Sequence, residues 1–168
     1  KWVYNTVMTT LALKKNPALR EYQAYINYLY GANNLRHFTI NEMLTNINRF
    51  SMRALKGIRK KDNEKTKLNS ILALSWFFSL MNQLGINMEE IVWERFPYVC
   101  SYWKECPCVC KSKKIKKRVE IKVVSKIKPK TMSDFQKMFE NIYPSESRTI
   151  EDAGIHAAEE TGELSEAV

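Results

Sequence analysis

Long stretches without glycine or proline do most to narrow the folds open to this chain. Only five of the 168 residues are Gly and five are Pro, and two uninterrupted stretches run from Gly31 to Gly57 and from Gly57 to Gly85. Within 41–58, apolar residues recur at the spacing of a helix that buries one face. The sequence therefore predicts an all-α helical bundle, with helices near 18–30, 41–58, 65–84, 87–96, 131–143 and 149–168.

Helix ends are predicted from the residues that favour them. Pro17 is suited to a helix start, and Gly31 and Gly85 are suited to helix stops. For the last two helices, the segment Ser133-Asp134 and Thr149 are the candidate N-terminal caps, because their side chains can accept hydrogen bonds from the free amides of the first turn.

The C-terminal segment carries carboxylates at helical spacing. At about 100° per residue, Glu159, Glu163 and Glu166 share one stripe and Glu160 flanks it. Like charges at this spacing repel one another, and a divalent cation among them would relieve the repulsion. Carboxylate oxygens suit Mg²⁺ or Mn²⁺. The alternative interpretation is a solvated acidic helix face.

The residues around these carboxylates resemble a known family. The run HAAEETGELSEA at 156–167 is similar to the Glu-Glu-x-x-Glu helix of the MazG-like, all-α nucleotide pyrophosphohydrolases. The resemblance implies hydrolysis of a nucleoside triphosphate to monophosphate and pyrophosphate. It also implies that Glu159, Glu160 and Glu163 hold Mg²⁺, that Glu166 joins them or activates water, and that the protein is an obligate dimer or a pseudo-dimer.

The family's second motif, Glu-x-x-Asp, is expected on the next helix. The sequence stops at Val168, before that helix. If the protein continues, an acidic pair is expected about 14 to 17 residues later. The 168-residue chain alone is expected to be inactive.

An internal repeat extends the resemblance. The segments 21–30 and 134–143 match in acid, aromatic, Gln and terminal Tyr positions at an offset of 113 residues. We therefore predict an N-terminal arm at 1–17, a degenerate MazG-like unit at 18–97, a Cys-containing basic linker at 98–130, and the start of a second unit at 131–168.

At the same offset, the first copy lacks the predicted metal ligands. Asn46, Ile47 and Phe50 stand at the positions of Glu159, Glu160 and Glu163, and two further residues replace the expected Glu-x-x-Asp. Those two residues are Asn69 and Leu72. The first copy is therefore predicted to be a helical unit without the chemistry.

All four cysteines lie within eleven positions: Cys100, Cys106, Cys108 and Cys110. Four thiolates could complete a tetrahedral Zn²⁺ site. However, the spacing lacks a C-x2-C pair, and Trp103 stands where a second cysteine of such a pair would be expected. Free thiols in a loop and two disulfides are the alternatives.

The positive charge of the chain, +9 overall, is concentrated in 111–130, where ten Lys or Arg accompany Glu120 alone. This segment could bind the phosphates of a nucleic acid, but a solvated linker is favoured because no aromatic residues are interleaved with the charges. The alternation in 118–125 is typical of a short strand, so the insert is expected to be irregular with a possible strand.

Two other classes of function remain open beside the enzyme. The chain could be a non-catalytic nucleotide-sensing or protein-interaction subunit, because the first copy lacks the carboxylates, or a zinc-stabilised nucleic-acid-binding module based on 98–130. No apolar run reaches about 18 residues, so no membrane span is expected, and the segment 1–13 makes a poor signal-peptide core. Reduced or zinc-bound cysteines favour a cytoplasmic location.

Overall fold

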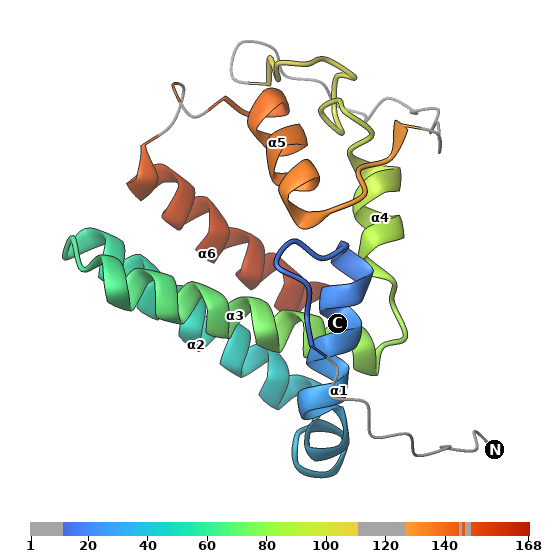
Figure 1. The fold of residues 1–168 in the computed structure, drawn as a ribbon. Helices are drawn as coiled ribbons and strands as arrows, with labels where there is room; N and C mark the ends of the chain where they lie inside the picture. The colour runs from blue at the N-terminus through green and yellow to red at the C-terminus, as the bar shows by residue number, and fades with distance from the viewer. Residues whose placement is uncertain (1–11, 111–126, 145, 147–148) are drawn as a thin grey trace.

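The computed structural model describes residues 12–110, 127–144, 146 and 149–168, and its regular elements there are helices (Figure 1). The prediction of an all-α fold is therefore confirmed. The order along the chain is α1 (Leu19–His37), α2 (Ile40–Arg59), α3 (Asn63–Gln83), α4 (Met88–Arg95), α5 (Met132–Ile142) and α6 (Ile150–Ala167).

Helices α2 and α3 form an antiparallel hairpin that contains the first core. Thr39 and Glu42 form a reciprocal capping box at the start of α2, and the Asp62 side chain accepts from the amide of Lys65 at the start of α3. The apolar stripe of α2 then faces that of α3. Its buried residues are Met43, Leu44, Ile47, Leu80 and Met81.

Helix α6 packs antiparallel against α2. Near its start, a Cβ placed on Gly154 would lie 2.7 Å from Cδ1 of Ile58, and near its end Ser165 Oγ accepts a 2.8 Å hydrogen bond from Asn48 Nδ2. Leu164 adds apolar contact to the first core. The C-terminal helix is thereby held beside a helix that precedes it by about a hundred residues (Figure 1).

A second core lies between α4, α5 and the cysteine-containing loop. Its buried residues are Trp93, Cys100, Phe135, Met138 and Ile142. The loop is fixed to α5 by backbone pairing, because the amide of Cys108 donates to the carbonyl of Ile142 at 2.8 Å. The segment predicted as a linker therefore contributes, in its described part, to a packed core.

Polar contacts join α1 to both cores. The Gln23 side chain donates to Asn82 on α3 at 3.1 Å and to the carbonyl of Ile86 at 2.7 Å. On α4, Glu89 is 3% exposed and accepts from the Arg20 amide at 3.1 Å, while Lys128 Nζ lies 3.1 Å from its carboxylate. Burial alone would lower the pKa of Lys128, but the two neighbouring carboxylates of α4 outweigh it and raise that pKa.

The predicted helix ends are partly right. Gly85 follows α3 with a positive φ of 69°, as a stop requires, and Thr149 caps α6 with a capping box. The stop predicted at Gly31 is wrong, because α1 continues to His37; one glycine inside a helix costs only about 1 kcal/mol. The cap of α5 is Thr131, with Asp134 completing its box, rather than Ser133.

The helix starts refine the predicted repeat. α1 and α5 begin 113 residues apart, as the offset requires, but the capping boxes of α2 and α6 are 110 apart, at Thr39 and Thr149. In the 110-residue register, the four buried or half-buried positions of α6 fall on buried or half-buried positions of α2. The four pairs join Leu44, Asn48, Ser51 and Ala54 of α2 to Gly154, Ala158, Thr161 and Leu164 of α6. Other buried positions of α2, Met43 and Ile47 among them, correspond to exposed residues of α6. The predicted 113-residue offset therefore does not hold at the capping boxes of α2 and α6, where it is three residues too long.

A matched pair of glycines tests the packing of the hairpin. A Cβ on Gly57 would lie 2.9 Å from the backbone nitrogen of Thr66, whereas a Cβ on Gly162 would have no neighbour within 4 Å. We expect Gly57→Ala to lower the free energy of unfolding by about 1–3 kcal/mol through overpacking. Gly162→Ala should raise it by about 0.5–1 kcal/mol through helix propensity. Urea denaturation of both variants measures this, and an equal effect of the two changes would contradict the close approach of α2 and α3.

Within the described residues, no single helix is both long and apolar enough to cross a membrane. α3 and α4 meet that criterion only when taken together, and they are bent by 101° relative to each other. The strand predicted at 118–125 and the basic run at 111–118 lie outside the described residues.

Candidate functional site

The predicted acidic ligands lie on one continuous helix, α6. The Thr149 hydroxyl accepts from the amide of Asp152 and fixes the start of this helix, so its residues keep a regular spacing over 18 positions. Glu159 and Glu163 are four residues apart and therefore point to the same side. All four predicted ligands are exposed: Glu159, Glu160, Glu163 and Glu166.

The opposite side of α6 packs against α2. Gly154 and Leu164 are turned towards that helix, and the stripe of Glu159, Glu163 and Glu166 lies about half a turn away from them. Among the described residues, the only ion pair of this stripe joins Glu159 to His156 Nδ1 at 3.0 Å. The stripe is therefore accessible to a cation or to another acidic helix.

The carboxylate oxygens of α6 suit a hard divalent cation, but α6 alone supplies too few of them. Carboxylate oxygens are the preferred ligands of Mg²⁺, which requires six oxygen ligands in near-octahedral geometry. In the part of the chain that the structure describes, no group of three or more carboxylate or imidazole ligand atoms lies within 4.8 Å of one another. Further oxygen ligands would have to come from a substrate, from water or from another helix.

The two residues predicted to replace the second acidic motif lie on α3. Asn69 is 9% exposed, and its side-chain amide donates to the carbonyl of Lys65 at 2.6 Å. Together with Leu72 it lines a groove between α2 and α3. No carboxylate at 69 or 72 is available there to hold a metal ion.

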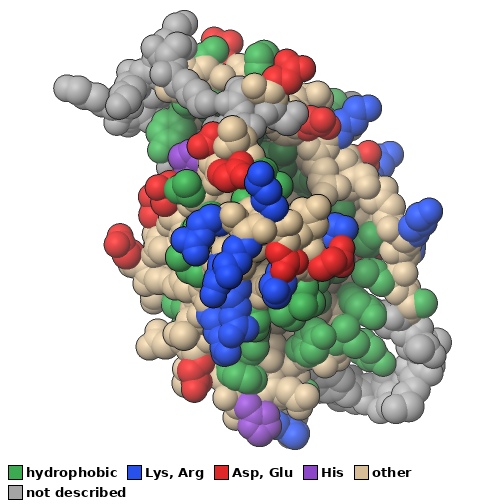
Figure 2. All heavy atoms as spheres, turned by 90° about the vertical axis from the view of Figure 1, so that its left-hand side faces the viewer, with side chains coloured by type: hydrophobic (Ala, Val, Ile, Leu, Met, Phe, Trp, Pro, Cys, Tyr) green, Lys and Arg blue, Asp and Glu red, His purple; other side chains and the backbone are tan. Residues whose placement is uncertain are grey.

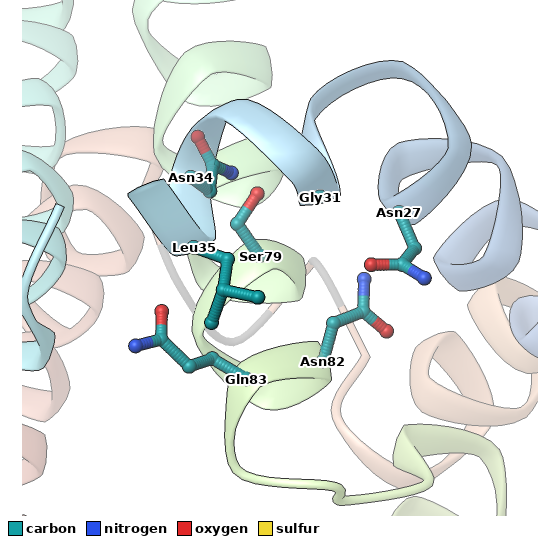
Figure 3. A pocket seen from close by; sticks show the side chains of 7 residues that line it. All are labelled: Asn27, Gly31, Asn34, Leu35, Ser79, Asn82 and Gln83. Atoms are coloured by element: carbon teal, nitrogen blue, oxygen red, sulfur yellow. The ribbon is translucent and has the colours of Figure 1, made fainter. Parts of the chain in front are cut away.

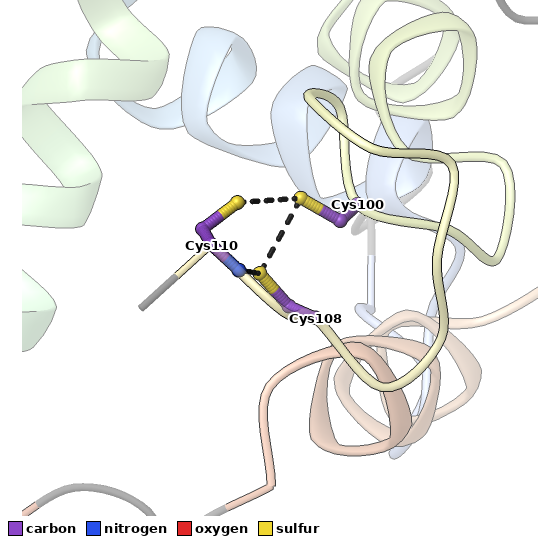
Figure 4. A group of neighbouring side chains, drawn as sticks. All are labelled: Cys100, Cys108 and Cys110. Atoms are coloured by element: carbon purple, nitrogen blue, oxygen red, sulfur yellow. Dashed lines mark hydrogen bonds between the residues drawn. The ribbon is translucent and has the colours of Figure 1, made fainter. Parts of the chain in front are cut away.

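Three of the four cysteines converge on one point. Figure 4 shows the Cys100 sulfur hydrogen-bonded to those of both Cys108 and Cys110, and each of these two Sγ–Sγ distances is 3.4 Å. The three sulfur atoms all lie within 4.8 Å of one another. Cys106 lies outside this group, and its Sγ donates to the carbonyl of Asn141 at 3.4 Å. The predicted four-cysteine set is thus reduced to three.

The group is arranged to hold negative charge at Cys100. Burial alone would raise the pKa of Cys100, but hydrogen bonds from the amides of Tyr102 and Trp103 and from the two neighbouring thiols lower that pKa to about 7. Burial raises the pKa of Cys110 to about 12, and its hydrogen bonds with the other two sulfurs act in the same direction. Burial and the nearby Cys100 charge also raise the pKa of Tyr143. Of these two thiols, Cys100 is therefore the one whose surroundings favour the charged form.

Sulfur donors at this spacing fit a soft metal ion. Ligand sulfurs about 2.3 Å from a tetrahedral Zn²⁺ lie about 3.8 Å from one another, close to the observed 3.4 Å. Three thiolates leave the fourth position to another ligand. Because Cys100 is 1% exposed and belongs to the second core, a metal ion here would fasten the loop to α5.

The structure also shows a polar pocket that the sequence analysis missed. It lies between α1 and α3 and has a volume of about 190 Å³. Figure 3 shows Asn27 and Asn82 pointing towards each other across it, with Gly31 on α1 and Ser79 on α3 nearby. Its lining includes Asn27, Gly31 and Asn34 at helical spacing, and this stripe of small and amide residues was the signal available in the sequence.

Comparisons with known proteins leave the resemblance of α6 without further support. No protein-family model, no curated protein and no solved structure matches this chain. The assignment of a function therefore depends on the residues of this chain and their arrangement.

Proposed function

We propose that the complete protein is a Mg²⁺-dependent nucleoside triphosphate pyrophosphohydrolase of the MazG-like type. The observation that carries this proposal is the exposed stripe of Glu159, Glu163 and Glu166 on the side of α6 turned away from α2. A row of exposed carboxylates on a well-capped helix, of which Glu159 alone has an ion-pair partner among the described residues, is suited to a divalent cation. The resemblance of 156–167 to the family's acidic helix supports the same conclusion.

The roles of the carboxylates follow from their chemistry. Glu159, Glu160 and Glu163 would hold Mg²⁺, which supplies charge neutralisation for the phosphate oxygens and a more acidic bound water. Glu166 is one turn beyond Glu163 on the same stripe, where it can join the ligands or accept a proton from attacking water. The products would be a nucleoside monophosphate and pyrophosphate.

The proposal requires oxygen ligands from another helix, which would have to lie along the exposed stripe of α6. A separate groove, on the α2 side of α6, can hold a further helix. It runs between α2, α3 and α6, has a volume of about 470 Å³, and is lined mainly by apolar or small side chains. Ala157 lines this groove, and Glu160 follows it by one helical turn, so Glu160 borders the groove. A helix packed there, from the same chain or from a second copy, would complete a four-helix arrangement. A homo-oligomer is part of the proposal.

For the cysteines we propose a structural Zn²⁺ held by Cys100, Cys108 and Cys110. The burial of Cys100 in the second core and the paired backbone of Cys108 and Ile142 support a structural role. Cys106 is not a ligand in this proposal.

The strongest alternative function is a non-catalytic subunit that senses nucleotides or binds another protein. It is favoured by Asn69 and Leu72, which leave the first unit without an acidic pair. A zinc-stabilised nucleic-acid-binding module is a further alternative that rests on 98–130.

The decisive experiment compares two lengths of the protein. With Mg²⁺ and a panel of nucleoside triphosphates, we expect no pyrophosphate release from residues 1–168, because one helix supplies too few ligands. We expect release from the natural full-length protein, including any residues that follow Val168. Equal inactivity of both, with nucleotide binding retained, would favour the sensing subunit. Release from residues 1–168 alone would contradict the need for a second acidic helix.

A further inference from the structure

A groove near the turn that joins α2 to α3 is lined mainly by basic residues. It has a volume of about 450 Å³, and its charged lining consists of Arg53, Lys56, Lys60, Lys65 and a single carboxylate, Asp62. Figure 2 shows Lys and Arg side chains gathered on this side of the molecule. The lining therefore has an excess of positive charge.

Most of this charge is not neutralised within the described residues. Lys65 forms an ion pair with Asp62 at 2.8 Å, and this contact lowers the pKa of Asp62. No ion pair of the described part involves Arg53, Lys56 or Lys60. Three unpaired cations around one concave surface produce a positive potential that attracts anions.

The alignment of α2 with α6 relates the residues of this groove to the proposed metal ligands. When Thr39 is aligned with Thr149, Arg49, Arg53 and Lys56 occupy the positions of the acidic residues that the proposed function places around Mg²⁺. Those acidic residues are Glu159, Glu163 and Glu166. At three corresponding positions the charge is therefore inverted.

A charge-inverted surface can bind the same substrate group by a different route. The carboxylates of α6 need a divalent cation between themselves and a phosphate, whereas Arg and Lys contact phosphate oxygens directly through charge-assisted hydrogen bonds. The loss of the acidic pair at Asn69 and Leu72 is consistent with this route, because a groove without a metal needs no acidic ligands.

The groove also has an apolar side. Leu68, Leu72 and the half-buried ring of Phe50 line it. The guanidinium carbon of Arg53 lies 5.8 Å from the centre of that ring, which restrains this side chain at the groove. Arg49, which is not part of the lining, lies 5.7 Å from the same ring. A ligand with a multiply charged end and a flatter, less polar end would match both parts of the surface.

We propose that this groove binds the triphosphate chain of a nucleotide directly, without a metal ion. Arg53, Lys56 and Lys60 contact the phosphates, and the sugar or base lies along Leu68 and Leu72. The site is separate from the carboxylates of α6, so the binding does not require the enzymatic activity proposed for them. The first helical unit, 18–97, then binds a nucleotide through residues of its own helices.

Titration calorimetry in EDTA tests this proposal on residues 1–168, with a non-hydrolysable nucleoside triphosphate and inorganic tripolyphosphate as probes. The double variant Arg53→Gln/Lys60→Gln should weaken binding of both probes by about tenfold or more, because two direct phosphate contacts are lost. The control Lys104→Gln/Lys137→Gln removes the same charge at exposed positions outside the groove. It should change binding less than about twofold, which separates groove contacts from the general attraction of a basic chain.

Further arms identify the ligand and distinguish this site from the site on α6. A Leu72→Ser change should weaken binding of the nucleotide about threefold or more and leave binding of tripolyphosphate unchanged. Equal effects on both probes would assign the groove to free polyphosphate and overturn the nucleotide assignment. Equal losses in the two double variants would overturn the proposal, and so would binding that requires Mg²⁺ and is lost in Glu163→Gln. Tighter binding of a single-stranded oligonucleotide that is lost in Arg53→Gln/Lys60→Gln would also overturn it, because the groove would then be a nucleic-acid site. Its success or failure leaves the pyrophosphate assay unaffected, because EDTA excludes the metal-dependent reaction.

Discussion

Natural full-length protein carrying Glu163→Gln should release pyrophosphate from a nucleoside triphosphate at least about 100-fold more slowly than the unmodified protein. The substitution keeps the size and helix propensity of the side chain but removes the charge that would bind Mg²⁺. Because Glu163 is exposed and has no ion-pair partner among the described residues, the helix should remain folded. Pyrophosphate release at several Mg²⁺ concentrations measures the effect.

Glu151→Gln is the matched control for this change. Glu151 lies in the first turn of α6, is exposed, and lies outside the stripe of proposed ligands. It should retain activity within about threefold, and circular dichroism should show the same helix content in both variants. Comparable activity in Glu163→Gln and Glu151→Gln at every Mg²⁺ concentration would show that the stripe does not hold the catalytic cation.

The second large effect concerns the cysteine group. Protein purified under reducing conditions should carry about one equivalent of zinc, and Cys100→Ser should carry almost none, because Cys100 contacts both other sulfurs. Cys106→Ser should keep its zinc, since Cys106 lies outside the group. Elemental analysis of the three proteins measures this, and metal loss in Cys106→Ser would restore a four-cysteine site.

The cysteine group also predicts that one added thiol strengthens the binding of zinc. The amide of Trp103 hydrogen-bonds to Cys100, so the backbone at 103 lies beside the cysteine group, and we expect a thiol introduced there to fill the fourth position. Trp103→Cys should tighten zinc binding about tenfold or more in a competition with a chelator. Binding should weaken as the pH falls, because protons compete for the thiolates. An unchanged affinity, or metal loading that is independent of pH between about 5 and 8, would count against thiolate coordination.

The helices could be predicted from the sequence because their signals are local. The spacing of Met43, Leu44 and Ile47 predicted the buried face of α2, and Thr149 marked the start of α6. The error at Gly31 has a physical reason: a glycine permits a helix stop but does not impose one, and α1 runs unbroken over 19 residues through Gly31. Where a glycine permits the helix either to stop or to continue, the packing of the neighbouring elements decides where the helix ends.

The composition of the sites could not be predicted in the same way. The equal spacing of Cys106, Cys108 and Cys110 does not reveal that one sulfur turns towards Asn141 while the other two meet Cys100, because the fold of the loop decides this. Likewise, the three-residue shift between α2 and α6 depends on where each helix is capped. The charge inversion at Arg53 depends on the alignment of Thr39 with Thr149, and the positions of these two capping boxes come from the structure.

The central claim, that α6 binds the catalytic cation, is tested most directly by replacing Mg²⁺ with paramagnetic Mn²⁺ in an NMR experiment on the full-length protein with a non-hydrolysable nucleoside triphosphate. Mn²⁺ favours the same oxygen ligands as Mg²⁺ and broadens the signals of nearby amides. The account predicts selective broadening of residues 159–166, and its loss in Glu163→Gln. Uniform broadening, or broadening centred on another part of the chain and unchanged in Glu163→Gln, would contradict it.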